Sequence, residues 1–352
     1  MGRRASELSR LALLQFASLA LSFSLLSSCG GGSGGSDSSG GGGGCTAASN
    51  AHPTFTVSPA DLSGITAIQP RGSANSGEIK PHTFFYVTSA TANVAVSAPV
   101  DSTLDAIAYY TELGLSQWLL VFRASCEVTY KFDHLISVPA AIASAGPSSP
   151  GSTTVTSSPT RSVSVRAGDI VGNSRGNLEA GTPNAFDFGV YNTTVTNQFV
   201  NQARYVNSHM DTRLHSDCPY DYYQDPLKSQ FAAKFGTSAG PVAGATCGSA
   251  SRDVSGTAAG MWFLDAGTDA TYPATLGFAA DVNADARISG LAGRTIIVAG
   301  GVDPATVTTT QCWSNGGEFA YVSVVNAQQM NVSYGAGVCP GAFPATFKTY
   351  SR

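Results

Sequence analysis

The 352-residue sequence has few charged residues and few helix signals. Only 12% of its residues are charged, whereas 39 are glycine. Its N-terminal apolar run, residues 11–26, is 16 residues long, and a membrane-spanning helix needs about 20. The sequence contains neither His-Glu-x-x-His nor a phosphate-binding glycine loop with lysine, which excludes the zincin and P-loop signatures. No two cysteines have the Cys-x-x-Cys spacing of a zinc knuckle or a redox site.

The N-terminus has the order of an export signal. A basic start, an apolar run and a small-residue box follow one another: Arg3, Arg4, Arg10, residues 11–26 and Leu26-Ser27-Ser28-Cys29. This order is typical of a signal sequence that is removed, and the alternative is a short anchor that stays attached. Residues 30–44 are almost entirely Gly and Ser, which predicts a flexible tether with an r.m.s. span of about 20 Å.

This N-terminus resembles that of bacterial lipoproteins, with residues 1–28 as signal peptide and residues 29–50 as lipidated cysteine and tether. The resemblance implies a diacylglyceryl thioether on Cys29 and an acylated amino group, which together hold a protein on a membrane. The residue directly after Cys29 is Gly30 and not Asp, and by the resemblance to lipoproteins this favours the outer membrane. We therefore expect an exported protein, anchored to a bacterial membrane through Cys29 on the periplasmic or cell-surface side.

The remaining chain is acidic and has an even number of cysteines. Removing residues 1–28 takes away three arginines and one glutamate, so the net charge moves from −4 to −6 and argues against nucleic acid as a partner. Six cysteines in an exported protein suggest disulfides, and they allow 15 pairings. We predict two pairs within the C-terminal half and a third by elimination: Cys218–Cys247, Cys312–Cys339 and Cys45–Cys126.

Strand patterns dominate the rest of the sequence. Val128, Tyr130 and Phe132 alternate with Thr129, Lys131 and Asp133, which places the apolar set on one face of a sheet. The clearest helix signal is Asp225-Pro226-Leu227, with Asp225 as the N-cap. We predict a mainly β protein with a β domain at 51–200, a connector with one short helix at 201–236, and a small β-rich module at 237–352.

Four segments in order resemble the lysostaphin-like zinc endopeptidases that cut peptidoglycan cross-bridges. They cover about a third of the chain: Val96-Ser97-Ala98-Pro99 with the strand after it, Val128 to Leu135, Val165 to Gly172, and Ala185-Phe186-Asp187-Phe188. The resemblance implies a twisted β-sandwich of the duplicated hybrid motif kind. It also implies a zinc site, in which the metal would have three protein ligands and one open position for water.

The residues at the family's functional positions match only in part. By resemblance, His82 is the first zinc ligand, Asp187 takes the place of the third, and His134 matches a catalytic histidine. Tyr86 stands where the family has its aspartate ligand, and a phenol is a poor zinc ligand at neutral pH. Ala185 replaces the second catalytic histidine. Both His82 and His134 have an alternative interpretation as hydrogen-bonded strand-end residues without metal.

These substitutions favour a lipid-anchored envelope protein that has lost catalysis and binds peptidoglycan or an envelope protein, with no cofactor. The alternative is an active zinc metallopeptidase that cuts peptidoglycan peptides with an altered ligand set, His82 and Asp187 plus a third group. A further alternative assigns binding to the C-terminal module around Trp262, although an aromatic flanked by apolar residues usually packs in a core. Residues 281–285 begin like a calcium loop, but Ala286 and Ala292 stand at its two defining positions, which favours a polar turn.

Overall fold

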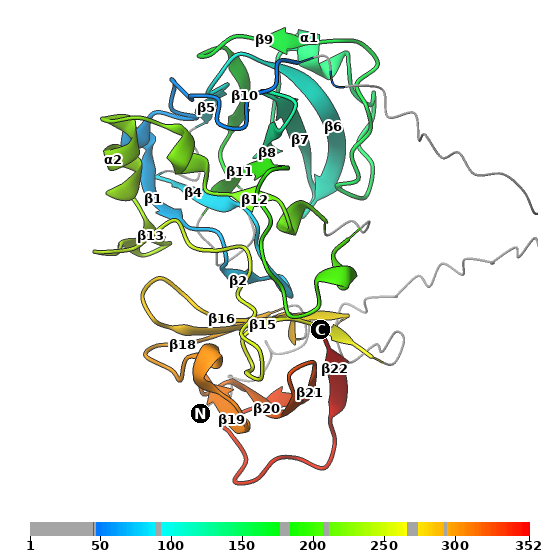
Figure 1. Cartoon of the computed structure of the whole chain (residues 1–352), viewed down its shortest axis with the longest axis vertical. Helices are drawn as coiled ribbons and strands as arrows, with labels where there is room; N and C mark the ends of the chain where they lie inside the picture. Colours follow the sequence, from blue (N-terminus) through cyan, green and yellow to red (C-terminus); the bar gives the residue numbers. More distant parts are fainter. Residues whose placement is uncertain are drawn as a thin grey trace, which may run out of the picture. The chain divides into compact units, whose positions relative to one another are not determined.

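Two eight-stranded antiparallel sheets form the framework of this protein (Figure 1). The computed structural model describes residues 45, 47–88, 93–176, 184–206, 211–265, 274–291 and 294–352. The described part is mainly β-strand, which confirms the predicted fold class. The predicted signal sequence 1–28, Cys29 and the tether 30–44 lie outside the described residues. Within the described residues, no helix has the length and apolarity needed to cross a membrane.

The first sheet contains the segments 128–135 and 185–188 quoted above, whereas the segments that begin at Val96 and Val165 are divided between it and a separate strand pair. Its strands, in spatial order, are β1 (Ile65–Gln69), β4 (Thr83–Val87), β11 (Ala185–Asn192), β8 (Val128–Leu135), β7 (Leu115–Arg123), β6 (Ser102–Glu112) and β9 (Ser164–Val165), and β12 (Ser216–Asp217) also pairs with β11. A separate pair joins β5 (Val94–Ser97) to β10 (Ile170–Ser174). The short helix α1 (Ala140–Ala143) follows β8 along the chain.

Strand alternation gives the first sheet one aromatic face. Phe85, Phe132, Phe186 and Phe188 are fully buried and their rings contact one another, as in the stacked pair Phe132–Phe188 at 5.2 Å. Because successive side chains on a strand point to opposite faces, the residues between these phenylalanines lie on the other face. That face carries polar residues, and it is buried as well over most of β11.

The second sheet follows in the C-terminal part of the chain. Its strands, in spatial order, are β18 (Thr295–Val298), β17 (Ala286–Ser289), β16 (Thr275–Ala280), β15 (Gly260–Leu264), β22 (Lys348–Ser351), β21 (Gln329–Ala336), β20 (Glu318–Asn326) and β19 (Thr310–Ser314). Trp262 and Trp313 are buried in its core, so Trp262 packs as the sequence predicts. Residues 281–285 form the hydrogen-bonded turn between β16 and β17, with Asp281 N donating to the Asp285 carbonyl.

A short hairpin forms part of the contact between the two sheets. The hairpin pairs β2 (Ala74–Asn75) with β3 (Glu78–Ile79), and Gly77 N at its turn donates to Ser289 Oγ over 2.8 Å. A Cβ on Gly277 would lie 2.9 Å from the Glu78 carbonyl oxygen, so β16 approaches the hairpin backbone closely. Residues 45–352 form one compact unit, and the predicted module boundaries between 200 and 237 stay a prediction.

The connector contains the predicted helix, one residue later than expected. Helix α2 (Leu227–Ala232) has Pro226 at its N-cap, whereas Asp225 was expected there. Asp225 still caps the first turn, because its Oδ1 accepts a hydrogen bond from Ser229 N. Beyond α2, a small hairpin pairs β13 (Gly236–Thr237) with β14 (Gly240–Pro241).

The structure pairs the six cysteines as the sequence analysis predicts. The bonds are Cys45–Cys126, Cys218–Cys247 and Cys312–Cys339, with Cα–Cα distances of 5.5, 6.0 and 5.9 Å. Such bonds persist in oxidising compartments, so they indicate an exported protein.

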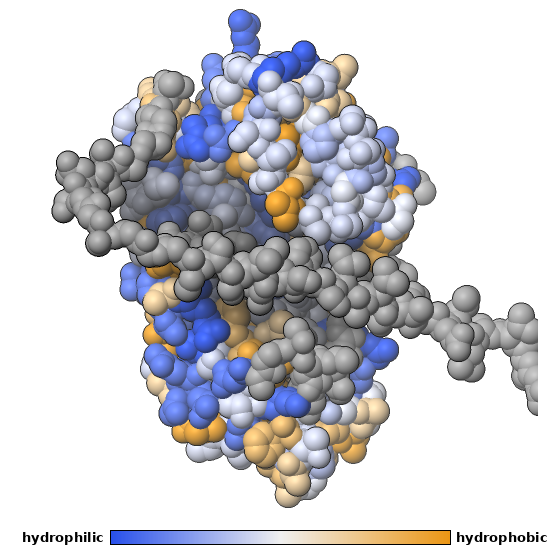
Figure 2. All heavy atoms as spheres, turned by 90° about the vertical axis from the view of Figure 1, so that its right-hand side faces the viewer, coloured by the Kyte–Doolittle hydropathy of each residue, from blue (hydrophilic) through white to orange (hydrophobic). Residues whose placement is uncertain are grey.

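Figure 2 shows hydrophobic residues scattered among hydrophilic ones on the face in view, outside the atoms drawn in grey.

Candidate functional site

A cluster of polar side chains lies on the face of the first sheet opposite the phenylalanines. We call it the polar cluster, and it comprises His82, Tyr110, Gln117, Lys131, Asp133, His134 and Asp187. The strand register places its members together: Asp187 on β11 is the direct cross-strand partner of Asp133 on β8, and Gly189 is the partner of Lys131. Directly paired residues share a face, so Lys131, Asp133 and Asp187 point the same way.

Gly189 leaves the space that His82 occupies. A Cβ at this glycine would lie 2.9 Å from His82 Cβ and 3.1 Å from Tyr191 Oη, so no larger residue fits without displacement. The imidazole of His82 can therefore reach along β11 to Asp187. Its Nε2 lies 2.9 Å from Asp187 Oδ2, in a pair whose members are only 6% and 4% exposed.

The three site residues predicted from the sequence, His82, His134 and Asp187, converge. His134 Nε2 lies 3.8 Å from Asp187 Oδ2, the oxygen that His82 also contacts. His82 and Asp187 are 105 positions apart in the sequence, yet the structure brings them together with His134. Asp187 lies between the two imidazoles. Whether any of them binds metal or acts in catalysis stays a prediction.

His134 is held in an unusual backbone conformation. Its φ is +62°, a region that non-glycine residues rarely adopt, and Asp133 Oδ1 accepts a hydrogen bond from its backbone N at 2.9 Å. The imidazole Nδ1 lies 2.8 Å from Gln117 Oε1, which can only accept, so Nδ1 carries the proton. The other ring nitrogen, Nε2, faces the interior of the cluster, 3.8 Å from Asp187 Oδ2.

Asp133 and Lys131 were not among the predicted site residues. Asp133 is 5% exposed, and its Oδ1 also accepts a hydrogen bond from Tyr110 Oη at 2.7 Å. The ammonium of Lys131 lies 3.6 Å from Asp133 Oδ2 and 3.9 Å from Asp187 Oδ2. Burial lowers the pKa of Lys131, but Tyr191, Asp133 and Asp187 outweigh it, so the pKa of Lys131 is raised above its ordinary value.

Burial and charge act on His82 and Asp187 in opposite ways. Burial lowers the pKa of His82 to about 4, against the opposing effect of Asp187, so His82 is neutral at pH 7. Burial alone would raise the pKa of Asp187, but His82, His134 and Lys131 outweigh it and hold the pKa well below its usual range. The cluster therefore keeps an ionised carboxylate in the interior. Two of its buried atoms, His82 Nδ1 and Asp187 Oδ1, have no hydrogen-bond partner within the described chain.

Tyr86 is engaged away from the polar cluster. Its hydroxyl donates to Gln69 Oε1, and Gln69 Nε2 in turn donates to the Asp281 carboxylate of the second sheet over 3.2 Å. Arg287 Nη1 completes this network at 2.9 Å from Asp281 Oδ2. Burial raises the pKa of Tyr86 to about 12, so the phenol keeps its proton at neutral pH. Tyr86 is therefore part of the contact between the sheets.

The donor set of the polar cluster can be compared with what zinc requires. Asp133, His134 and Asp187 offer ligand atoms that all lie within 4.8 Å of one another, so a metal-binding arrangement exists among the described residues. A hydrolytic zinc site also needs an open position for water and no competing cation. Here the Lys131 ammonium lies beside both carboxylates, and His82 Nε2 is directed to Asp187. The residues present therefore do not fit a resident zinc ion.

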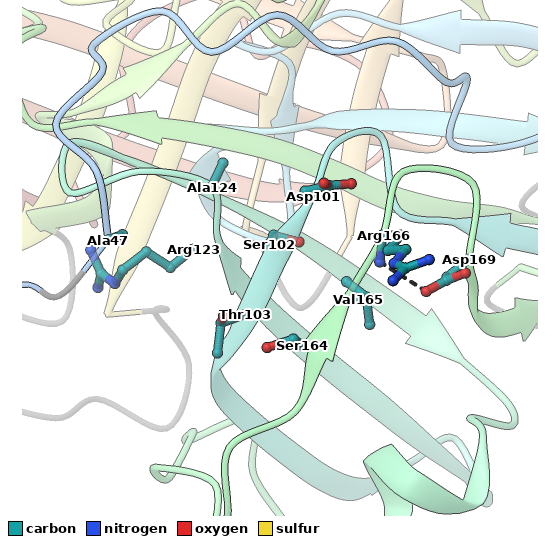
Figure 3. A pocket seen from close by; sticks show the side chains of 10 residues that line it. All are labelled: Ala47, Asp101, Ser102, Thr103, Arg123, Ala124, Ser164, Val165, Arg166 and Asp169. Atoms are coloured by element: carbon teal, nitrogen blue, oxygen red, sulfur yellow. Dashed lines mark hydrogen bonds between the residues drawn. The ribbon is translucent and has the colours of Figure 1, made fainter.

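A pocket with paired charges lies elsewhere on the first sheet. It measures about 620 Å³ and is lined around the start of β6 and β9 by Ser102, Thr103, Ser164, Val165 and neighbouring residues (Figure 3). Arg123 in its wall forms two 2.8 Å hydrogen bonds with Asp105. Asp169 accepts from the backbone N of Arg166 at 2.8 Å. No member of the polar cluster lines it, so the pocket offers no comparable chemistry.

Comparisons with known proteins leave the family open. No protein-family model and no curated protein matches the sequence. Among solved structures, a solution structure of lysostaphin is similar over 80% of this chain and 87% of its own length, at 12% identity and a TM-score of 0.26. A TM-score this low does not establish a common fold. The lysostaphin-like assignment and the duplicated hybrid motif therefore stay predictions.

Proposed function

We propose that this protein is anchored to a bacterial membrane through Cys29 and binds peptidoglycan or an envelope protein without hydrolysing it. The observation that carries the proposal is the internal compensation of the polar cluster. Asp133 and Asp187 are balanced by the Lys131 ammonium, and Asp187 is hydrogen-bonded to His82. A cluster whose carboxylates already have an internal cation does not depend on a bound metal ion for its shape.

Hydrolysis of a peptide bond would need groups that this face does not supply. A metal-activated water must be polarised by an ion with an open position, and a second group must stabilise the developing oxyanion. Ala185 has no polar side chain, and the Tyr86 hydroxyl is engaged by Gln69. Loss of one such partner commonly costs 100- to 1,000-fold in rate, roughly, and here two positions are changed.

The test is sedimentation of the full-length, detergent-solubilised protein with purified sacculi. We expect the protein to sediment with the sacculi and to release no soluble peptidoglycan fragments from them. Cross-linking in intact cells covers the other partner class, an envelope protein. Absence of both sacculus binding and an envelope cross-link would refute the proposal. Loss of membrane association in C29A, with the folded part intact, is expected from the lipid anchor.

The convergence of His82, His134 and Asp187 favours one second candidate, a metallopeptidase with an altered ligand set. This candidate predicts one zinc ion per chain after purification without chelator. It also predicts zinc-dependent cleavage of peptidoglycan peptides. Zinc far below one equivalent per chain would exclude it.

A further inference from the structure

We propose that the ammonium of Lys131 is the resident cation of the polar cluster, and that it keeps a latent divalent-metal site of Asp133, His134 and Asp187 closed. The inference concerns the chemistry of the cluster and does not depend on which envelope component the protein binds.

The position of Lys131 places its ammonium beside both carboxylates of the cluster. Lys131 and Asp133 are two residues apart on β8, and Asp187 faces Asp133 from β11, so all three side chains leave the same face of paired central strands. The lysine nitrogen lies within 3.9 Å of both carboxylates. The Lys131 side chain is 15% exposed, so little water screens these ion pairs. The backbone of a central sheet fixes this arrangement.

The charges of Asp133 and Asp187 also favour Lys131 as the cation of the cluster. Carboxylates directly opposite each other on paired strands repel, and a buried pair needs a positive charge nearby. His82 Nε2 lies 2.9 Å from Asp187 Oδ2, so His82 contacts one of the two carboxylates, whereas the Lys131 ammonium lies near both. Within the described residues, Lys131 is the lysine that forms ion pairs with both Asp133 and Asp187. The ammonium therefore supplies what a bound metal would otherwise supply.

The ligand atoms of Asp133, His134 and Asp187 lie close together. Two carboxylates and one imidazole are three donors of the kinds that bind zinc, and their ligand atoms already lie within 4.8 Å of one another. An ion bound about 2.1 Å from Asp133 Oδ2 would lie at most about 5.7 Å from the lysine nitrogen, where two positive charges repel strongly in a buried site. Removal of that charge should therefore open the site.

The experiment compares zinc binding by the wild-type protein and K131M. The methionine keeps most of the buried aliphatic volume and removes the charge. We expect one zinc ion to bind K131M at least about 100-fold more tightly than wild type, from the order of magnitude of the Coulomb repulsion. Isothermal titration gives the affinities, and zinc-dependent melting temperatures give an independent readout. We expect zinc to raise the melting temperature of K131M and to leave that of the wild type unchanged.

Two matched variants separate charge from volume and identify the ligands. K131R keeps a positive charge, so it should gain no zinc affinity. K131M/D187N loses a ligand, so the gain of K131M should disappear. If K131M does not fold without metal, refolding of K131M and K131Q with zinc decides. Zinc-dependent recovery of the folded state supports the proposal, and continued failure with zinc overturns it.

The wild type alone also tests the proposal. Stoichiometric zinc binding at micromolar affinity, with a rise in melting temperature, would overturn it, as would a folded K131M with no gain in affinity. Sacculus binding is measured separately on the same preparations. Because that assay reports the envelope ligand and the titration reports the cation, failure of either proposal is distinguishable from failure of the other.

Discussion

His82 makes the stability of this protein depend on pH in a definite window. Its pKa is lowered from 6.5 to about 4 in the folded protein. Between those two values the unfolded chain binds the proton more readily than the folded chain does. Stability therefore rises with pH across the window, and the contribution is complete above about pH 6.5 and lost progressively down to about pH 4. A shift of about 2.5 units at 1.36 kcal/mol per unit corresponds to about 3 kcal/mol.

The substitution H82Q removes this titration. The glutamine amide can still donate to Asp187 but takes up no proton near neutral pH. Urea unfolding of both proteins at intervals from pH 4 to 7.5 should show that the wild type loses about 3 kcal/mol more than H82Q on acidification. Lys131, Lys80 and Asp187 act on His82 in the wild type, and all three are unchanged in the variant.

A matched control uses a histidine outside the cluster. His52 is exposed, so H52Q should follow the wild-type pH profile. The carboxylates that do not contact His82 titrate in all three proteins and cancel in the comparison, whereas Asp187 keeps a hydrogen-bond donor in the glutamine amide. The reasoning fails if H82Q and the wild type lose stability in parallel from pH 6.5 to 4, because the buried neutral imidazole would then make no contribution.

Three other changes have defined outcomes. Replacing both Cys45 and Cys126 by alanine removes a bond with a sequence separation of 81, which should lower the unfolding free energy by about 4 kcal/mol in the chain-entropy model; equal urea midpoints for variant and wild type would contradict this. G189A places a methyl group 2.9 Å from His82 Cβ and should destabilise the protein by about 1–3 kcal/mol, which thermal unfolding would measure. G114A is the comparison: its Cβ meets open space but its φ is +77°, so this variant measures the cost of backbone strain alone. Y86F removes a hydrogen bond between the sheets and should cost about 1 kcal/mol without changing sacculus binding, whereas a loss of binding at full stability would place Tyr86 in the ligand site.

The sequence predicts the composition of the site better than its geometry. The alternation of residues 128–133 shows that Lys131 and Asp133 share a face opposite Tyr130 and Phe132, and the structure agrees. It does not show that Asp133 faces Asp187, because strand register depends on tertiary pairing between segments that are 54 residues apart. Lys131 is therefore absent from the site predicted from the sequence, although the alternation places it on the same face as Asp133.

Other features divide in the same way. The number of cysteines predicts disulfides but leaves 15 pairings, and the structure has the pairing that we chose among them. The role of Tyr86 does not follow, because its partner Gln69 is 17 residues away on β1 and the rest of its network belongs to the second sheet. Local patterns fix faces and elements, whereas contacts between sheets require the assembled structure.

The substitutions at the predicted site are physically consistent with one another. A buried pair of facing carboxylates needs a cation, and a bound metal and a lysine ammonium are alternative ways to provide one. In this chain Lys131 lies on the same strand as Asp133 and opposite Gly189, two residues along β11 from Asp187, so the sheet itself places a cation beside both carboxylates. With the cation supplied by the chain, Tyr86 is not needed as a ligand, and its hydroxyl instead contributes to the contact with the second sheet. Such a cluster keeps a cation beside its two buried carboxylates without an exchangeable ion.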